Sequence, residues 1–246
     1  MNKVAIITGA GTGVGKATAV KLSDAGFSVI LIGRRKNKLD ETKTACNNEA
    51  IVIPMDVSNE TEVKKCFELV EKEFSRVDLL FNNAGTFLSS KTIDKISFNE
   101  WKEVIEVNLN GMFLFSKYAF SLMKNQSPIG GRIINNGSVS AYAPRPGSIA
   151  YTATKHAVTG MTKSLSLDGR PFSIVCSQID IGNASTDMTK AMKNGVPQAN
   201  GSIAPEPTMD PENVVKVVKQ MATLPLDANI QFVTIMATKM PLIGRG

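Results

Sequence analysis

The sequence is poor in the residues that build metal sites and disulfide frameworks. Its 246 residues include one histidine and three cysteines, and Cys46, Cys66 and Cys176 are widely spaced with no CxxC pair. An odd number of scattered cysteines does not indicate a disulfide framework, and one histidine gives no zinc-binding pattern. We therefore expect neither a structural disulfide nor a metal site.

Long hydrophobic runs are also missing. No window approaches the roughly 20 apolar residues that a membrane-spanning helix needs. The opening "MNKVAIITGAG" reaches glycines too early for an export signal with an apolar core and a cleavage site. The composition, 43% hydrophobic and 20% charged, is that of an ordinary soluble domain. We predict a cytoplasmic protein without a membrane partner.

Positive charge is in excess but is not concentrated. Lysine and arginine exceed aspartate and glutamate by 28 to 22, and the basic residues are dispersed apart from "RRKNK" at 34–38. A nucleic-acid-binding face would need a clustered basic patch. The sequence therefore predicts no nucleic-acid partner, and residues 34–38 favour a local site for one phosphate.

Short apolar runs alternate with amphipathic stretches along almost the whole chain. The runs begin with "VAIIT" at 4–8 and "SVILIG" at 28–33 and recur near residues 50, 77, 132, 172 and 228. Continuous apolar runs indicate parallel strands that are buried on both faces. The intervening stretches predict helices at 14–25, 36–47, 60–74, 98–124, 151–167 and 211–222. This alternation predicts an α/β fold, a doubly wound, Rossmann-like parallel sheet with helices on both faces.

Residues 183–211 break this alternation. The segment is rich in small, polar and proline residues, and no linker or internal repeat is found elsewhere. A loop of this length in a compact domain is usually functional. We interpret it as a mobile lid over a substrate, within a single domain that spans residues 1–246.

The stretch "TGAGTGVG", residues 8–15, stands between the first strand and the first helix. Gly9, Gly13 and Gly15 would let the backbone approach a pyrophosphate, and the start of the helix offers N–H groups and a positive dipole end. Glycine-rich turns also occur for steric reasons alone. The position directly after a strand favours a dinucleotide site.

The end of the second strand, "LIGRRK", bears on the choice of cofactor. An acidic residue there would bind the ribose of NAD, but the sequence has Gly33 followed by Arg34 and Arg35. A charge-assisted hydrogen bond to a 2′-phosphate is worth about 1.5–3 kcal/mol, or roughly 10- to 100-fold in affinity. NADP(H) is therefore favoured. NAD(H) stays possible, because these arginines could also be solvated residues at a helix start.

Two further turns follow predicted strands. Asp56 lies in "MDVS" after the third strand, and "NNAG", residues 82–85, follows the fourth. The carboxyl ends of parallel strands meet at one edge of a sheet, where ligands bind in open α/β folds. Ala84 and Gly85 would leave space for a flat ring, while the asparagines could tie strands together or simply form a turn.

Tyr151 and Lys155, in "YTATK", are four residues apart and so share one helix face. A free phenol holds its proton too strongly to act as a base near neutral pH, but an adjacent ammonium stabilises the phenolate. Tyr151 could then give a proton to a carbonyl or take one from an alcohol. Ser138, at the end of the preceding strand, could hydrogen-bond the same oxygen. Alone, such a pair is usually a feature of a helix surface.

The glycine turn, "NNAG", the serine and "YTATK" occur in an order that resembles the compact, single-domain branch of the short-chain dehydrogenase/reductase superfamily, over about residues 3–240. The resemblance implies a seven-stranded parallel sheet and reversible hydride transfer between NAD(P) and a carbonyl or alcohol. It implies that Tyr151 is the acid/base, that Ser138 orients the substrate oxygen, and that Lys155 promotes ionisation of the phenol and holds the nicotinamide ribose. Asn108, in "EVNLNG", resembles the asparagine that kinks a helix and positions a water.

The resemblance also implies a set of cofactor-binding residues, with two departures from the usual pattern. Ile181 replaces a common proline in "IDIGNAST", although Gly182 and Thr186 stay in register. Thr12 stands where many NADP-preferring members have a basic residue, so the preference rests mainly on Arg34. The implied cofactor-binding set is Thr8, Gly9, Thr12, Gly13, Val14, Gly15, Arg34, Arg35, Asp56, Val57, Asn83, Ala84, Gly85, Tyr151, Lys155, Gly182 and Thr186.

Together these features predict an NADP(H)-dependent oxidoreductase acting on a small or medium carbonyl or alcohol. The alternative is a non-catalytic, dinucleotide-sensing regulator on the same fold. The sequence leaves ketoacyl thioesters, hydroxy acids, sugars and aromatic ketones open as substrates, and Arg145 could meet an acidic substrate or be a solvated turn residue. Residues 98–124 and 151–167 form the helices through which members of the superfamily commonly associate, so we expect a homo-dimer or homo-tetramer.

Overall fold

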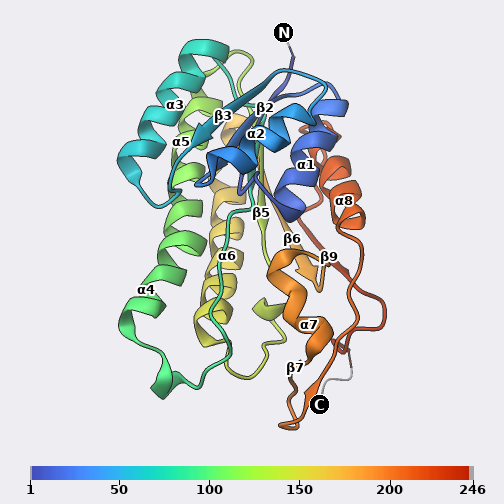
Figure 1. Ribbon diagram of the computed structural model, residues 1–246. Coiled ribbons are helices and arrows are strands. Elements are labelled where there is room, and N and C mark those ends of the chain that lie inside the picture. Colours follow the sequence, from blue (N-terminus) through green and yellow to red (C-terminus); the bar gives the residue numbers. More distant parts are fainter. Residues whose placement is uncertain (1, 244–246) are drawn as a thin grey trace.

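A seven-stranded parallel sheet forms the centre of the computed structural model, which describes residues 2–243 (Figure 1). Residue 1 and residues 244–246 of the predicted domain lie outside the described residues. The strand order is β3-β2-β1-β4-β5-β6-β9, as the α/β prediction requires. The strands are β1 (Val4–Thr8), β2 (Ser28–Gly33), β3 (Ala50–Pro54), β4 (Leu79–Asn82), β5 (Gly131–Asn136), β6 (Ile174–Gly182) and β9 (Phe232–Met236).

Helices cover both faces of the sheet because successive side chains of each buried strand point to opposite sides. Ile7 of β1 packs in one apolar cluster with residues of α1 and α8, whereas Ile6 packs in another with residues of α3 and α5. Figure 1 shows α1 and α8 on one side and α3, α5 and α6 on the other. The helices are α1 (Gly13–Asp24), α2 (Lys36–Thr44), α3 (Glu60–Phe74), α4 (Phe98–Ile105), α5 (Gly111–Asn125), α6 (Ile149–Asp168) and α8 (Pro211–Thr223).

The helix expected at 98–124 is not continuous. A π-helical segment, Glu106–Asn110, separates α4 from α5. Such a bulge adds one residue to a turn, which a hydrophobic period of 3.6 residues does not reveal. Asn108 lies in this segment and is buried.

Residues 183–211 are more structured than a loop. They contain a 3₁₀ turn (Asp187–Thr189), α7 (Lys190–Asn194) and a two-stranded antiparallel pair, β7 (Val196–Pro197) and β8 (Ile203–Ala204). The two ends of the segment meet where Ala184 pairs with Met209. In Figure 1, α7 and β7 lie low in the view, below α1 and α8. Elements this short leave no periodic pattern in a sequence, which is why only a loop was predicted.

Two classes of feature are absent from the described residues. No helix among them is both long and apolar enough to cross a membrane. No group of three or more histidine, cysteine, aspartate or glutamate side chains in the described part of the chain is arranged to hold a metal ion.

The turn between β1 and α1 requires glycine for a steric reason. Gly9 has a φ of 67°, in the left-handed region that favours glycine. Gly15, in the first turn of α1, lies so close to it that an added Cβ would be 2.2 Å from the Gly9 carbonyl oxygen. The helix can therefore start directly over the end of β1 only if this side chain is absent.

We predict that Gly15→Ala lowers the free energy of unfolding by about 1–3 kcal/mol, because the methyl group forces the turn and α1 apart. Gly160→Ala is the matched control, since Gly160 lies in α6 with nothing within 4 Å of an added Cβ. That change should raise stability by up to about 1 kcal/mol through helix propensity. Urea denaturation measures both, and equal stability of Gly15→Ala and the wild type would contradict the close approach.

Candidate active site

One cavity of about 760 Å³ follows the carboxyl edge of the sheet. Its lining comes from the turns that follow the strands and from the start of α6. Most of the residues predicted to bind cofactor or substrate line it: Gly9, Thr12, Gly13, Val14, Arg34, Arg35, Asp56, Val57, Asn83, Ala84, Gly85, Ser138, Tyr151, Lys155 and Thr186. Positions spread over 178 residues of sequence, from 9 to 186, are thus brought to one cavity.

Four predicted site residues are not among the described lining residues: Thr8, Gly15, Asn108 and Gly182. Thr8 holds two turns together, because its Oγ1 accepts hydrogen bonds from the backbone N–H groups of Asn83 and Ala84, both at 2.9 Å. The Asn83 side chain donates in return to the Thr8 carbonyl oxygen at 3.0 Å. These contacts fix the crevice between β1 and β4, where the lining begins.

Ile181, where the sequence departs from the usual proline, lies near the end of β6. Isoleucine keeps the backbone N–H that proline lacks, and β6 continues through Ile181, which pairs with Ile235 of β9. Gly182 is buried against β9, where an added Cβ would lie 2.8 Å from the Met236 Cβ atom. The cavity is reached instead by Ile181 and by Asn183.

Charged side chains of both signs gather at the glycine-turn end of the cavity. Arg34 and Arg35 are exposed and line it, and Arg35 Nη2 donates to Thr12 Oγ1 at 3.5 Å. Asp56 also lines this end. Hydrogen bonds from the backbone N–H and hydroxyl of Ser58, aided by the charge of Arg34, outweigh partial burial and hold the pKa of Asp56 below its ordinary value. Two guanidinium groups and two ionised carboxylates, those of Asp56 and Asp187, therefore share this end.

Tyr151 and Lys155 lie against each other on α6, as their spacing predicts. The Lys155 Nζ atom is 5.4 Å from the centroid of the Tyr151 ring. The ammonium is buried and donates to the carbonyl oxygen of Asn136, at the end of β5, at 2.6 Å. The Asn136 side chain in turn donates to Asn83 Oδ1 at 3.0 Å. Lys155 is thus held in place between the sheet and the tyrosine.

Asn108 connects three separate elements behind this pair. Its Oδ1 accepts from the Thr86 backbone N–H at 2.7 Å, and its Nδ2 donates to the Thr86 carbonyl oxygen at 2.8 Å. The same Nδ2 donates to Thr154 Oγ1, on α6, at 3.3 Å. The π-helical segment therefore joins the chain after β4 to the helix that carries Tyr151.

Asn136 and Asp180 are polar residues of the site that the sequence interpretation did not identify. Asn136 holds Lys155, and Asp180 of β6 accepts hydrogen bonds from the Ser138 backbone N–H at 2.9 Å and from the Gln178 side chain at 2.8 Å. Burial raises the pKa of Asp180, although these hydrogen bonds and the charge of Lys155 oppose the rise. The available signal was an aspartate inside an apolar strand run, "SQIDIG".

Comparison with known proteins agrees with this geometry. The profile of the family described as "short chain dehydrogenase" matches residues 3–196. An uncharacterised oxidoreductase of Staphylococcus aureus (strain N315) is 31% identical over 235 residues, covering 95% of this chain and 96% of the relative. A 3beta-hydroxysteroid dehydrogenase of Mediterraneibacter gnavus is 32% identical over 191 residues, covering 76% of this chain and 68% of the relative.

Solved structures show the same fold. The closed form of serine dehydrogenase complexed with NADP+ has a TM-score of 0.83 at 25% identity, with 94% of each chain covered. Similar structures include complexes with NADH and with NADP. The extent of the family match, together with the sheet order, shows that this chain belongs to the short-chain dehydrogenase family of NAD(P)-binding oxidoreductases.

Proposed function

We propose that the protein is an NADP(H)-dependent oxidoreductase that moves hydride between the nicotinamide and a carbonyl or alcohol, with Tyr151 as the acid/base. The observation that carries the proposal is the single cavity, because it joins a glycine turn of the dinucleotide-binding type to Ser138, Tyr151 and Lys155. Neither end alone would distinguish an enzyme from a nucleotide-binding module.

The residues at the glycine-turn end suit a dinucleotide. Gly9, Thr12 and Gly13 present backbone to the cavity at the start of α1, where unpaired N–H groups and the helix dipole favour a pyrophosphate. Arg34 and Arg35 would hold a 2′-phosphate. When bound, the nicotinamide supplies or accepts the hydride.

At the other end of the cavity, Ser138 and Tyr151 can bind the substrate oxygen and transfer a proton to or from it. Ser138 Oγ accepts a hydrogen bond from the Ser140 backbone N–H at 3.1 Å, so its own O–H is available to a substrate oxygen. Asp180 holds the backbone of Ser138 in position. The Tyr151 hydroxyl donates its proton to the carbonyl oxygen in reduction and takes it back in oxidation, and the buried ammonium of Lys155 lies against its ring.

Cofactor preference is tested by titrating the protein with NADPH and with NADH at one ionic strength, followed by fluorescence. We expect NADPH to bind roughly 10- to 100-fold more tightly, from charge-assisted hydrogen bonds to the 2′-phosphate. Arg34→Ala should bring the NADPH affinity towards that for NADH. Arg170→Ala is the control, because Arg170 is also exposed but precedes β6, at the opposite edge of the sheet. Tighter binding of NADH by the wild type would refute the NADP assignment.

The role of Tyr151 is tested by Tyr151→Phe. We expect a loss of about 10²- to 10⁴-fold in kcat, the usual worth of general acid–base catalysis, with cofactor affinity largely kept. Tyr142→Phe is the matched control, since the Tyr142 hydroxyl bonds Thr234 Oγ1 at 2.8 Å and Tyr142 is not among the described lining residues. Full activity of Tyr151→Phe would remove this tyrosine from the chemistry. Cofactor binding by a wild type that reduces no carbonyl would favour the regulator.

We further propose that the protein acts in the cytoplasm as a homo-dimer or homo-tetramer. Large apolar side chains are exposed on the helices expected to associate, including Phe113 of α5 (54% exposed) and Leu167 of α6 (58% exposed). Burying such side chains is a common driving force for subunit association. Light scattering at micromolar concentration should give two or four times the 26.4 kDa chain mass, and a monomeric mass would overturn this prediction.

A further inference from the structure

Beyond the glycine turn, the lining of the cavity includes several large apolar side chains. Phe87, Leu88, Ile96, Val139, Met192 and Val196 line it. Among the described lining residues, Arg34, Arg35, Asp56 and Asp187 belong to the glycine-turn end, and Lys155 lies beneath Tyr151. Arg145, which precedes α6, is therefore the charged side chain whose state decides what charge the other end accepts.

Arg145 is already occupied by an acid from the segment 183–211. Its Nε donates to Glu206 Oε1 at 3.3 Å, and its Nη2 forms a second contact with Glu206 Oε2. Nη2 also donates to Asn183 Oδ1 at 2.8 Å. The Arg145 side chain is 16% exposed and that of Glu206 only 1%. Arg145 is thus not the solvated turn residue considered from the sequence, and its guanidinium is already paired with a carboxylate.

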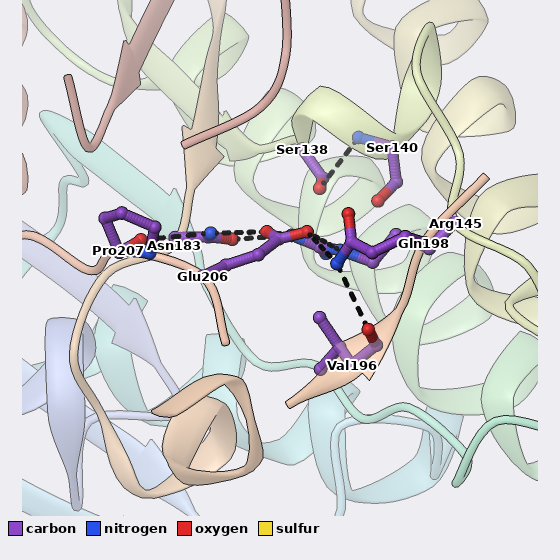
Figure 2. Close-up of polar contacts among 8 residues, drawn as sticks. All are labelled: Ser138, Ser140, Arg145, Asn183, Val196, Gln198, Glu206 and Pro207. Atoms are coloured by element: carbon purple, nitrogen blue, oxygen red, sulfur yellow. Dashed lines mark hydrogen bonds and ion pairs between the residues drawn. The ribbon is translucent and has the colours of Figure 1, made fainter. Parts of the chain in front are cut away.

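Two amides also donate hydrogen bonds to the Glu206 carboxylate. Asn183 Nδ2 donates to Oε2 at 2.8 Å and Gln198 Nε2 donates to Oε1 at 3.1 Å. Figure 2 shows Arg145, Asn183 and Gln198 converging on Glu206. Asn183 adopts a φ of 52°, a left-handed conformation that asparagine tolerates better than most residues. The carboxylate therefore accepts hydrogen bonds from Arg145, which precedes α6, and from two amides within the segment 183–211 itself.

These donors keep Glu206 ionised. Burial acts to raise the pKa of Glu206, but hydrogen bonds from Arg145, Asn183 and Gln198 and the charge of Arg145 outweigh it and lower the pKa to about 2. At neutral pH the pair consequently carries no net charge. An anionic substrate would have to compete with a carboxylate that is fixed in place and already desolvated.

We propose that Glu206 is a specificity-determining residue, which neutralises Arg145 so that the site accepts uncharged ketones or secondary alcohols with apolar flanks and rejects substrates that bear a carboxylate. This inference rests on the proposed function. Family membership does not decide which substrate charge the site accepts, because one relative is named for a hydroxysteroid and a similar structure for the amino acid serine. The choice follows from the Arg145–Glu206 contact.

The test compares isosteric ketones that differ by one charge. Acetoacetamide and acetoacetate place the charge near the ketone, and 4-acetylbenzamide and 4-acetylbenzoate place it farther away. Their Kd values are measured on the protein saturated with NADP+, which cannot reduce them. We expect the wild type to bind the amide of at least one pair 10-fold or more tightly than its acid. Tighter binding of the acids would overturn the inference, and this comparison needs no variant.

Two variants distinguish the effect of the Arg145 charge from the effect of opening the segment 183–211, the predicted lid. Glu206→Gln leaves Arg145 charged, and we expect the acid-to-amide affinity ratio to rise roughly 10- to 100-fold, the worth of a charge-assisted hydrogen bond. The double variant Arg145→Gln/Glu206→Gln has neither charge and should show no such rise. An equal rise in both variants would mean that opening of the lid, not charge, admits the acid, and would overturn the assignment.

Measurements on the same protein preparations distinguish a failure of this inference from a failure of the proposed function. Failure of the wild type to bind NADPH or NADH would overturn the proposed function. Cofactor binding with reduction of the acids at a kcat/KM equal to or above that of the amides would leave the oxidoreductase standing and overturn only the role of Glu206.

Discussion

At the centre of the sheet, β1 and β4 are neighbours, but the connections that leave them pass to opposite faces. The chain after β1 forms α1 on one face, and the chain after β4 leads to α5 on the other. The two turns must therefore separate, and a crevice opens at the carboxyl edge. The Thr8 hydroxyl oxygen fixes the width of this crevice, because it accepts hydrogen bonds from the backbone N–H groups of Asn83 and Ala84 in the turn after β4. Every other part of the site is built outward from this contact.

The sequence predicted the features that depend on local pattern. Buried parallel strands require apolar side chains on both faces, so runs such as "VAIIT" were recognisable without tertiary information. Tyr151 and Lys155 meet because four residues make about one helical turn. The break at Glu106–Asn110 was invisible as a pattern, because one inserted residue hardly shifts the hydrophobic face, and only the resemblance of Asn108 to a helix-kinking asparagine pointed to it.

Residues whose partners are distant in sequence could not be predicted in the same way. Asp180 acts on Ser138 across 42 positions and Glu206 meets Arg145 across 61 positions. From the sequence alone, Glu206 looks like an ordinary surface residue, and Asp180 looks like an unusual acid within an apolar strand. What defines their role is burial together with a donor from another segment, and both arise only when the chain has folded.

The arginines of the cavity show how the fold gives one residue type opposite roles. Arg34 and Arg35 follow β2 at an exposed edge, where water and a phosphate can reach them, so their charge stays available to a ligand. Arg145 has the same charge, but the segment 183–211 folds across it and brings a carboxylate that the cavity wall shields from water. Electrostatic attraction increases as solvent is excluded. Arg145 therefore binds Glu206 strongly, and we expect its guanidinium not to be free to bind a ligand. The cavity therefore has two arginines that a ligand can reach at the glycine-turn end, and at the other end one arginine that is already paired with a carboxylate.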